Sequence, residues 1–104
     1  MEKYCIVQTT TNDKETALKI TSNLLKKKLA ACIQSHTIKS SYRWKGNLEN
    51  SEEIILNIKT KTSLFEKIKK EIEENHNYET PEIVSVPILD GSEKYLKWID
   101  EETE

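Results

Sequence analysis

The sequence is poor in the residue types that mark several protein classes. Among its 104 residues are only two glycines, two prolines and two cysteines. Cys5 and Cys32 are too few for a disulfide scaffold and lack the Cys-x-x-Cys spacing of zinc and redox sites, so we expect both to be small buried residues. No apolar run approaches the roughly 20 residues that cross a bilayer. Met1-Glu2-Lys3 leads into a patterned strand and not into a signal peptide. We therefore expect a cytoplasmic protein with no membrane partner.

Neither sign of charge dominates. Sixteen basic side chains stand against eighteen acidic ones, which gives a formal net charge of −2. Non-specific nucleic-acid binding depends on an excess of positive charge, so we predict no nucleic-acid partner. The run Lys26-Lys27-Lys28 is interpreted as the basic last turn of a helix, where it offsets the macrodipole. The length suits one domain, residues 1–104.

The first third of the chain is patterned as a strand followed by a helix. Tyr4–Thr9 is predicted as a short strand, because apolar residues precede a cluster of threonine, asparagine and aspartate. Asn12 and Glu15 have the spacing of a capping box and predict the start of a helix. Apolar residues at helical spacing extend that helix to about Lys28.

A long hairpin is predicted next. An extended pattern runs from Ala30 to Trp44, and Lys45-Gly46-Asn47 is typical of a hairpin turn. Glu53–Lys59 returns as the third strand, in which alternate isoleucine and leucine residues give one apolar face and one mixed face. The other face carries both Glu53 and Lys59.

The last third is patterned as helix, strand and helix. Ser63 and Glu66 form a second capping box, and the helix that they predict ends near Asn75-His76-Asn77. Ile83–Ile88 is predicted as a fourth strand, and Pro87 indicates a strand end or an edge strand because it cannot donate a ladder hydrogen bond. A final short helix follows, capped by Ser92.

The predicted order of elements is β-α-β-β-α-β-α, which indicates an α+β fold. It suits an antiparallel sheet with two helices on one face, the ferredoxin-like βαββαβ arrangement, with a long β-hairpin and a short C-terminal helix. In that topology the third strand lies between the first two. Cys5 and Cys32 would then be about 9.6 Å apart laterally, beyond the reach of a disulfide.

The hairpin is too long for one copy of the chain. A strand from Ala30 to Trp44 spans roughly 50 Å, whereas a domain of this size is about 35 Å across. The end of the hairpin must therefore overhang, and it carries Tyr42 and Trp44 on one face. Exposed aromatic surface and unpaired edges are covered when copies of a chain form a closed homo-oligomer.

Five segments spread along the chain form a distinctive combination. They are Lys28-Leu29-Ala30-Ala31-Cys32, Tyr42-Arg43-Trp44-Lys45-Gly46, Ile58-Lys59-Thr60, His76-Asn77-Tyr78-Glu79-Thr80-Pro81-Glu82 and Tyr95-Leu96-Lys97-Trp98-Ile99. In these segments and in their order the chain resembles the CutA family of divalent-cation tolerance proteins. The resemblance implies a ferredoxin-like subunit that forms a compact homotrimer through its long hairpin, and it implies no established catalytic cycle.

The resemblance also implies a bound divalent cation such as copper. Bacterial members with a proposed copper site use a cysteine in the first strand and two adjacent histidines. In this chain those positions are similar to Gln8, Asn75 and His76. One imidazole with two carboxamides lacks the donors of a soft copper site, so we expect weak binding with His76 as the metal ligand, near Glu79 or Glu82. The alternative is a histidine that bonds the last carbonyls of its helix.

Two further groups of residues are candidates for binding. Tyr42 and Trp44 are interpreted as anchors of the trimer interface, and the alternative is a binding platform. Glu53 and Lys59 share a strand face and could line a cleft or pair with other surface charges. The residues that we assign to a possible cleft are Glu53, Lys59, Tyr78, Glu79 and Glu82.

Two functions fit these features. The first is a homotrimeric divalent-cation tolerance protein that binds copper or another divalent metal weakly. The alternative is a PII-like signalling trimer that binds a small molecule or protein partner in clefts between subunits. With only Gly46 and Gly91 the chain lacks a glycine-rich phosphate loop. No nucleophile, base and orienting group occur at recognisable spacing, so we do not expect an enzyme.

Overall fold

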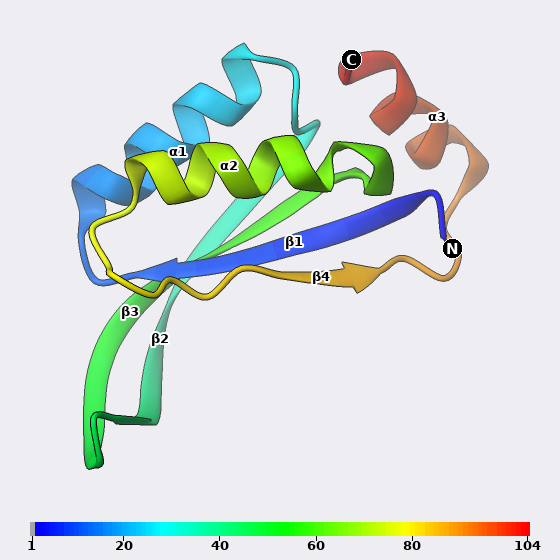
Figure 1. Ribbon diagram of the computed structural model, residues 1–104. Helices are drawn as coiled ribbons and strands as arrows, with labels where there is room; N and C mark the ends of the chain where they lie inside the picture. Colours follow the sequence, from blue (N-terminus) through cyan, green and yellow to red (C-terminus); the bar gives the residue numbers. More distant parts are fainter. Residues whose placement is uncertain (1) are drawn as a thin grey trace.

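The computed structural model describes residues 2–104. The predicted α+β order is confirmed (Figure 1). In chain order the elements are β1 (Tyr4–Thr11), α1 (Lys14–Lys26), β2 (Cys32–Trp44), β3 (Asn47–Lys61), the 3₁₀ turn η1 (Thr62–Leu64), α2 (Phe65–Asn75), β4 (Val84–Pro87) and α3 (Glu93–Glu102).

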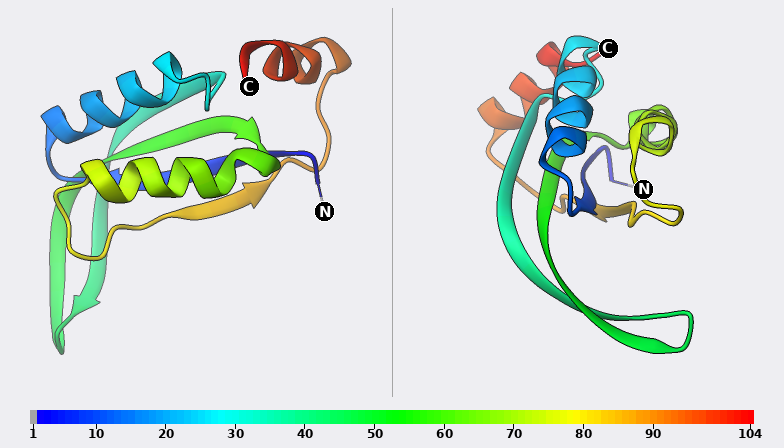
Figure 2. Two further views of the ribbon diagram at one scale, coloured as in Figure 1. Left: turned by 45° about the horizontal axis from the view of Figure 1, so that its top comes forward. Right: turned by 90° about the vertical axis from the view of Figure 1, so that its left-hand side faces the viewer.

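The four strands form one antiparallel sheet in the order β2-β3-β1-β4. Helices α1 and α2 lie side by side on one face, as in a ferredoxin-like fold, and α3 lies at one end (Figures 1 and 2). Pro87 is in the edge strand, as predicted. Cys5 pairs with Thr60 and Cys32 pairs with Lys59, so β3 separates the two free cysteines. Cys5 is buried but Cys32 is only half-buried, so the expectation of burial was wrong for Cys32.

The core lies between the sheet and the two helices. Alternate residues of β1 and β3 face it, because side chains of a strand point to opposite faces in turn. Helix α1 and helix α2 each contribute one apolar stripe at helical spacing. The largest fully buried apolar side chains are Val7, Ile20, Leu24, Leu56, Ile58, Ile68, Ile72 and Ile99. The opposite sheet face carries no helix over most of its area (Figure 2).

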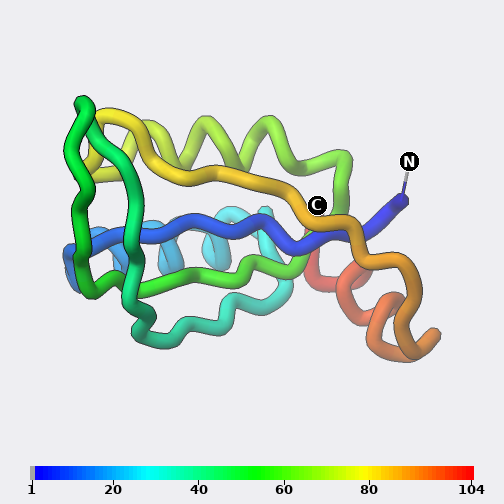
Figure 3. Tube along the Cα trace, turned by 90° about the horizontal axis from the view of Figure 1, so that it is seen from below, coloured from blue at the N-terminus to red at the C-terminus, as the bar shows by residue number. Residues whose placement is uncertain are grey.

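The distal half of the hairpin leaves the sheet. Strand β1 pairs with β3 only over Ile54–Lys61. The pairs from Ile38 with Glu53 to Trp44 with Asn47 therefore belong to the two-stranded ribbon alone. The ribbon curves toward the helix-free side and passes the chain that follows α2 (Figures 2 and 3). Overhang of the hairpin is thus confirmed.

A two-residue turn closes the hairpin. Lys45 has φ of 50° and Gly46 has φ of 84°, the two positive values that a type I′ turn requires. Asn47, which we predicted in the turn, is already the first residue of β3. Lys45 accepts the left-handed conformation at some cost, because its Cβ approaches the following carbonyl.

Local capping differs from the prediction at two of three helices. Asp13, and not Asn12, is the N-cap of α1, and its carboxylate accepts from the backbone N–H of Thr16 at 3.2 Å. Asn12 instead accepts a side-chain hydrogen bond from Asn77. The predicted capping box of Ser63 is wrong, because Ser63 lies inside η1 and α2 begins without a side-chain cap.

Some boundaries also moved. Strand β1 continues to Thr11, and α1 ends at Lys26 rather than near Lys28. Strand β2 begins at Cys32 and not at Ala30. The prediction for α3 is confirmed, since Ser92 accepts from the N–H of Tyr95 at 3.3 Å. Within residues 2–104 no helix has both the length and the apolar character needed to cross a membrane.

Candidate functional site

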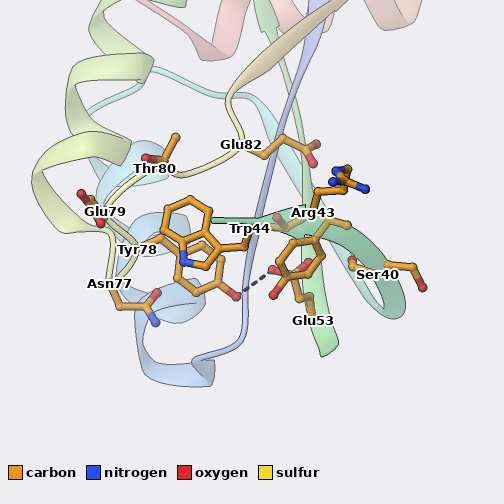
Figure 4. Close-up of a pocket in the computed structure, with 12 residues that line it drawn as sticks. Ser40, Arg43, Trp44, Glu53, Asn77, Tyr78, Glu79, Thr80 and Glu82 are labelled. Carbon is orange, nitrogen blue, oxygen red and sulfur yellow. Dashed lines mark hydrogen bonds between the residues drawn. The ribbon is translucent and has the colours of Figure 1, made fainter. Parts of the chain in front are cut away.

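A cleft of about 750 Å³ lies between the distal hairpin and the loop that follows α2. Trp44 and Glu53 project into it from the hairpin, and Tyr78 projects from the loop (Figure 4). Register places Tyr42 and Trp44 on the same face of the ribbon as Glu53, because directly paired residues of an antiparallel ladder share a face. The bend of the hairpin makes this face concave and creates the cleft.

A hydrogen bond between Glu53 and Tyr78 joins the two walls. The Tyr78 hydroxyl donates to Oε2 of Glu53 at 2.7 Å, and Glu53 is only 6% exposed. Burial raises the pKa of Tyr78 far above its usual value, and the bond to Glu53 and the charge of Glu53 raise it further. The phenol therefore stays protonated and serves as a donor to the carboxylate.

His76 orients the Tyr78 segment. Its Nδ1 accepts from the backbone N–H of Tyr78 at 2.9 Å, so Nε2 carries the proton and donates to the carbonyl of Thr10 at 2.8 Å. Burial lowers the pKa of His76, although the Thr10 carbonyl and the charge of Glu53 act in the opposite direction. The imidazole is neutral in this arrangement, and both of its nitrogens have partners.

The metal role of His76 stays a prediction. A metal ion would have to displace either the Tyr78 N–H or the Thr10 carbonyl from the ring. Within residues 2–104 no group of three or more histidine, cysteine, aspartate or glutamate side chains is placed to hold a metal ion. The other two positions of the family site are also engaged, because Gln8 donates to Asn57 and Asn75 donates to the carbonyl of Glu71.

The alternative that we gave for His76 needs a correction. The helix-terminal carbonyl is bonded by Asn75, whose Nδ2 lies 2.8 Å from the oxygen of Glu71. His76 itself reaches across to the last residues of β1. The sequence shows only that Asn75 and His76 lie at the end of a helix. Which of the two side chains bonds a carbonyl of that helix depends on the direction of the backbone after Asn75.

The rim of the cleft carries further charges. Glu82 is exposed, but partial burial still raises the pKa of its carboxyl, with the charge of Glu53 as the second cause. Glu79 is exposed, and Arg43 lies on the hairpin side (Figure 4). Of the residues that we assigned to a possible cleft, Glu53, Tyr78, Glu79 and Glu82 line it.

Lys59, which we also assigned to a possible cleft, does not line this one. It shares a strand face with Glu53, as the alternation predicts, but six residues of strand put the two side chains roughly 20 Å apart. The Lys59 ammonium lies instead 5.5 Å from the ring centroid of Tyr95 on α3. The alternation of side chains along a strand predicts which face of the sheet a residue lies on, but not which residues surround it.

Sequence reasoning missed several lining residues. Arg43, Asn77 and Thr10 line the cleft, but no local pattern marks them. Arg43 stands between two residues of the concave face, so alternation alone assigns it to the other face. In the structure Arg43 is nevertheless among the residues that line the cleft, and a sequence pattern does not encode the curvature and twist of the ribbon.

Tyr42 and Trp44 are partly exposed in the single chain, at 42% and 40%. The Lys45 ammonium lies 5.5 Å from the centroid of the Trp44 ring. The Tyr42 hydroxyl lies 3.3 Å from that of Ser51 across the ribbon. Their role as interface anchors stays a prediction.

Comparison with curated proteins finds relatives along almost the whole chain. The chain is 40% identical over 98 residues to the divalent-cation tolerance protein CutA of Pyrococcus horikoshii, covering 94% of this chain and 96% of that one. It is 36% identical over 99 residues to the chloroplastic protein CutA of Arabidopsis thaliana, of which it spans only 54%.

Solved structures and a family model give the same result. The periplasmic divalent cation tolerance protein CutA of Archaeoglobus fulgidus superposes with a TM-score of 0.94 at 37% identity, over 97% of this chain and 99% of that one. CutA1 of Oryza sativa gives 0.93 at 33% identity, over 99% and 95%. The model of the CutA1 divalent ion tolerance protein family matches residues 5–102. The chain therefore belongs to the CutA1 divalent ion tolerance family.

Proposed function

We propose that this protein acts in divalent-cation tolerance as a homotrimer that binds its ligands without a catalytic step. The observation that carries the assembly is the overhanging ribbon. It leaves Tyr42, Trp44 and Leu48 exposed, the last at 77%, on distal strand segments that pair only with each other within residues 2–104. Apolar ribbons of this kind are covered by a neighbour in stable proteins.

The helix-free sheet face supplies a second apolar surface. Val84 and Val86 of the edge strand β4 are 43% and 42% exposed and lie on this face, opposite Gln8 and Ile6. A ribbon from one copy and a sheet from the next form a head-to-tail contact, which closes into a ring under rotational symmetry. That the ring has three members is what resemblance to the CutA family implies.

Light scattering of the purified chain tests the assembly. A homotrimer has a mass of about 36 kDa, three times the 12.1 kDa of one chain. A mass of one chain at micromolar concentration would contradict the proposal. Sedimentation at several concentrations then separates a stable ring from a transient contact.

For the metal, we propose weak binding of copper or another divalent cation with His76 as the dominant ligand. The donor set supports weakness, because Gln8 and Asn75 offer carboxamides where a copper site needs thiolate and imidazole. Binding would also break one hydrogen bond of His76. Calorimetric titration with copper(II) and with zinc(II) measures the affinity, and tight stoichiometric binding of either ion would contradict this part of the proposal.

The cleft favours a second candidate, a PII-like trimer that senses a small ligand. Its volume of about 750 Å³ suits a small molecule. Its charge argues against a nucleotide, because three carboxylates and one guanidinium line it. We expect no binding of ATP by calorimetry, and a measurable ATP affinity would favour the signalling function over cation tolerance.

A further inference from the structure

The cleft has an excess of negative charge. Glu53, Glu79 and Glu82 line it together with one cation, Arg43. The ion pairs found within residues 2–104 involve none of these four side chains. Charges in a partly buried cavity are screened less than charges on an open surface, which is why the charge of Glu53 adds to burial in raising the pKa of Glu82. A cation inside the cleft would relieve this repulsion.

Glu53 has an acceptor oxygen left over. Tyr78 satisfies Oε2, but no group of residues 2–104 donates to Oε1, although Glu53 is only 6% exposed. In that part of the chain, the one side-chain atom that is fully sealed and unpartnered is Oγ1 of Thr9. Oε1 of Glu53 therefore remains reachable from the cleft. A nearly buried carboxylate oxygen without a donor is costly, so a ligand N–H at this position would be stabilising.

The walls beside Glu53 are aromatic. Tyr42 and Trp44 come from the hairpin and Tyr78 from the loop. The face of an aromatic ring attracts a cation within about 6 Å of its centroid. Trp44 already makes this contact with the ammonium group of Lys45, at 5.5 Å. Carboxylate oxygens beside aromatic faces are the two features that together recognise an organic cation.

The same features argue against other occupants. The excess of carboxylates repels an anion. A metal ion needs several converging donors, and within residues 2–104 no such group of three is found. Aromatic walls contribute nothing to metal coordination but do cover an alkyl chain.

We propose that the cleft binds a small organic ammonium ion, whose N–H groups donate to Oε1 of Glu53 and whose alkyl chain lies against Trp44 and Tyr42. The volume of about 750 Å³ is in the range of small-molecule sites. The free oxygen of Glu53 requires an N–H donor, so a primary ammonium fits better than a quaternary one. This inference does not depend on the metal binding proposed above, and it rests on the proposed trimer leaving the cleft-facing sides of Tyr42 and Trp44 open to the ligand.

The test is a calorimetric titration of the full chain, in its native assembly, with n-butylammonium chloride. We expect saturable binding. Butan-1-ol, which has the same chain without the charge, should not bind measurably. Tetramethylammonium, which has the charge without an N–H, should bind more weakly than n-butylammonium.

Two variants locate the site. Glu53→Gln should weaken n-butylammonium binding about tenfold or more, because a charge-assisted hydrogen bond is lost. The glutamine keeps an oxygen for the Tyr78 hydroxyl, and circular dichroism checks the fold. Glu52→Gln is the matched control, since Glu52 is the neighbouring glutamate, exposed on the opposite face of β3, and it should leave the affinity unchanged. Glu82→Gln serves as a second cleft variant and should also weaken binding.

Three results would overturn the inference. The first is equal affinity for n-butylammonium and butan-1-ol. The second is equal affinity of the Glu53→Gln and Glu52→Gln variants, or of Glu82→Gln and the parent should Glu53→Gln fail to fold. The third is a cleft that takes copper(II) but not n-butylammonium, which would assign it to a metal ion.

Discussion

Tyr78→Phe removes the one hydrogen-bond donor of Glu53 while it leaves the aromatic ring in place. The hydroxyl bonds a carboxylate that is only 6% exposed. A hydrogen bond to a charged group contributes about 1.5–3 kcal/mol to stability. Water that reaches the carboxylate offsets part of this loss in the variant. We therefore expect the free energy of unfolding to fall by about 2 kcal/mol at pH 7.

The assay is urea denaturation followed by circular dichroism, at one fixed chain concentration because assembly contributes to stability. Glu53→Gln and the double variant complete a double-mutant cycle. The two single losses should not add, because Tyr78→Phe removes the bond that Glu53→Gln weakens by taking away the charge of its acceptor. Additive losses, or a loss for Tyr78→Phe below about 0.5 kcal/mol, would refute the interaction as a stabilising one.

The remaining predictions concern assembly, metal, pH and the turn. Trp44→Ala should weaken assembly by a few kcal/mol, measured by sedimentation, whereas Trp98→Ala, which truncates an equally exposed tryptophan on α3, should not. His76→Ala should abolish the weak copper binding seen by calorimetry and lower stability by no more than about 1 kcal/mol. Because the folded state lowers the pKa of His76, its contribution to stability is complete above the unfolded pKa of about 6.5 and is lost as pH falls below it. Denaturation curves at several pH values should keep this dependence in His36→Gln and lose it in His76→Gln. Lys45→Asn should raise the melting temperature, since asparagine tolerates φ of 50° better than lysine, and an unchanged or lower value would contradict strain at the turn.

The sequence predicts the sheet and its faces well because period two is a strong local signal. Alternation in β3 placed Leu56 and Ile58 on the core side, where both are buried, and it placed Glu53 on the opposite side. Pro87 indicated a strand end or an edge, because it has no N–H for an inner ladder, and β4 both ends at Pro87 and lies at the edge of the sheet. These predictions depend only on local sequence patterns, so they do not require knowledge of the rest of the fold.

The helix N-caps were harder to predict, because adjacent residues are equally suitable as caps. Asn12 and Asp13 are both good N-caps, and Asp13 wins because the Thr16 backbone and hydroxyl both reach its carboxylate. Ser63 has the residue type of an N-cap, yet it lies inside the 3₁₀ turn η1 that precedes α2. A pattern three residues long does not decide between such neighbours.

The candidate site was predicted only in part because curvature creates it. Glu53 and Tyr78 were both selected from the sequence, but their hydrogen bond joins elements whose approach depends on the bend of the ribbon. Arg43 lines the cleft although alternation assigns its side chain to the other face, and Lys59 lies outside it because six residues of strand separate it from Glu53. The bend and twist of a long hairpin are properties of the whole ribbon, so they cannot be predicted from any single residue.

The two-residue turn at Lys45 and Gly46 also has a consequence for the order of folding. It joins strands that are adjacent in sequence, so this hairpin can close within microseconds. The pairing of β1 with β4 instead connects Cys5 to Pro87, near opposite ends of the chain, and such distant contacts form slowly. A nascent chain therefore presents a finished ribbon with a free edge before the sheet has closed. The newly made protein is then exposed to mispairing with other copies, and the proposed trimer would protect the subunits only if it assembled before that edge found another partner.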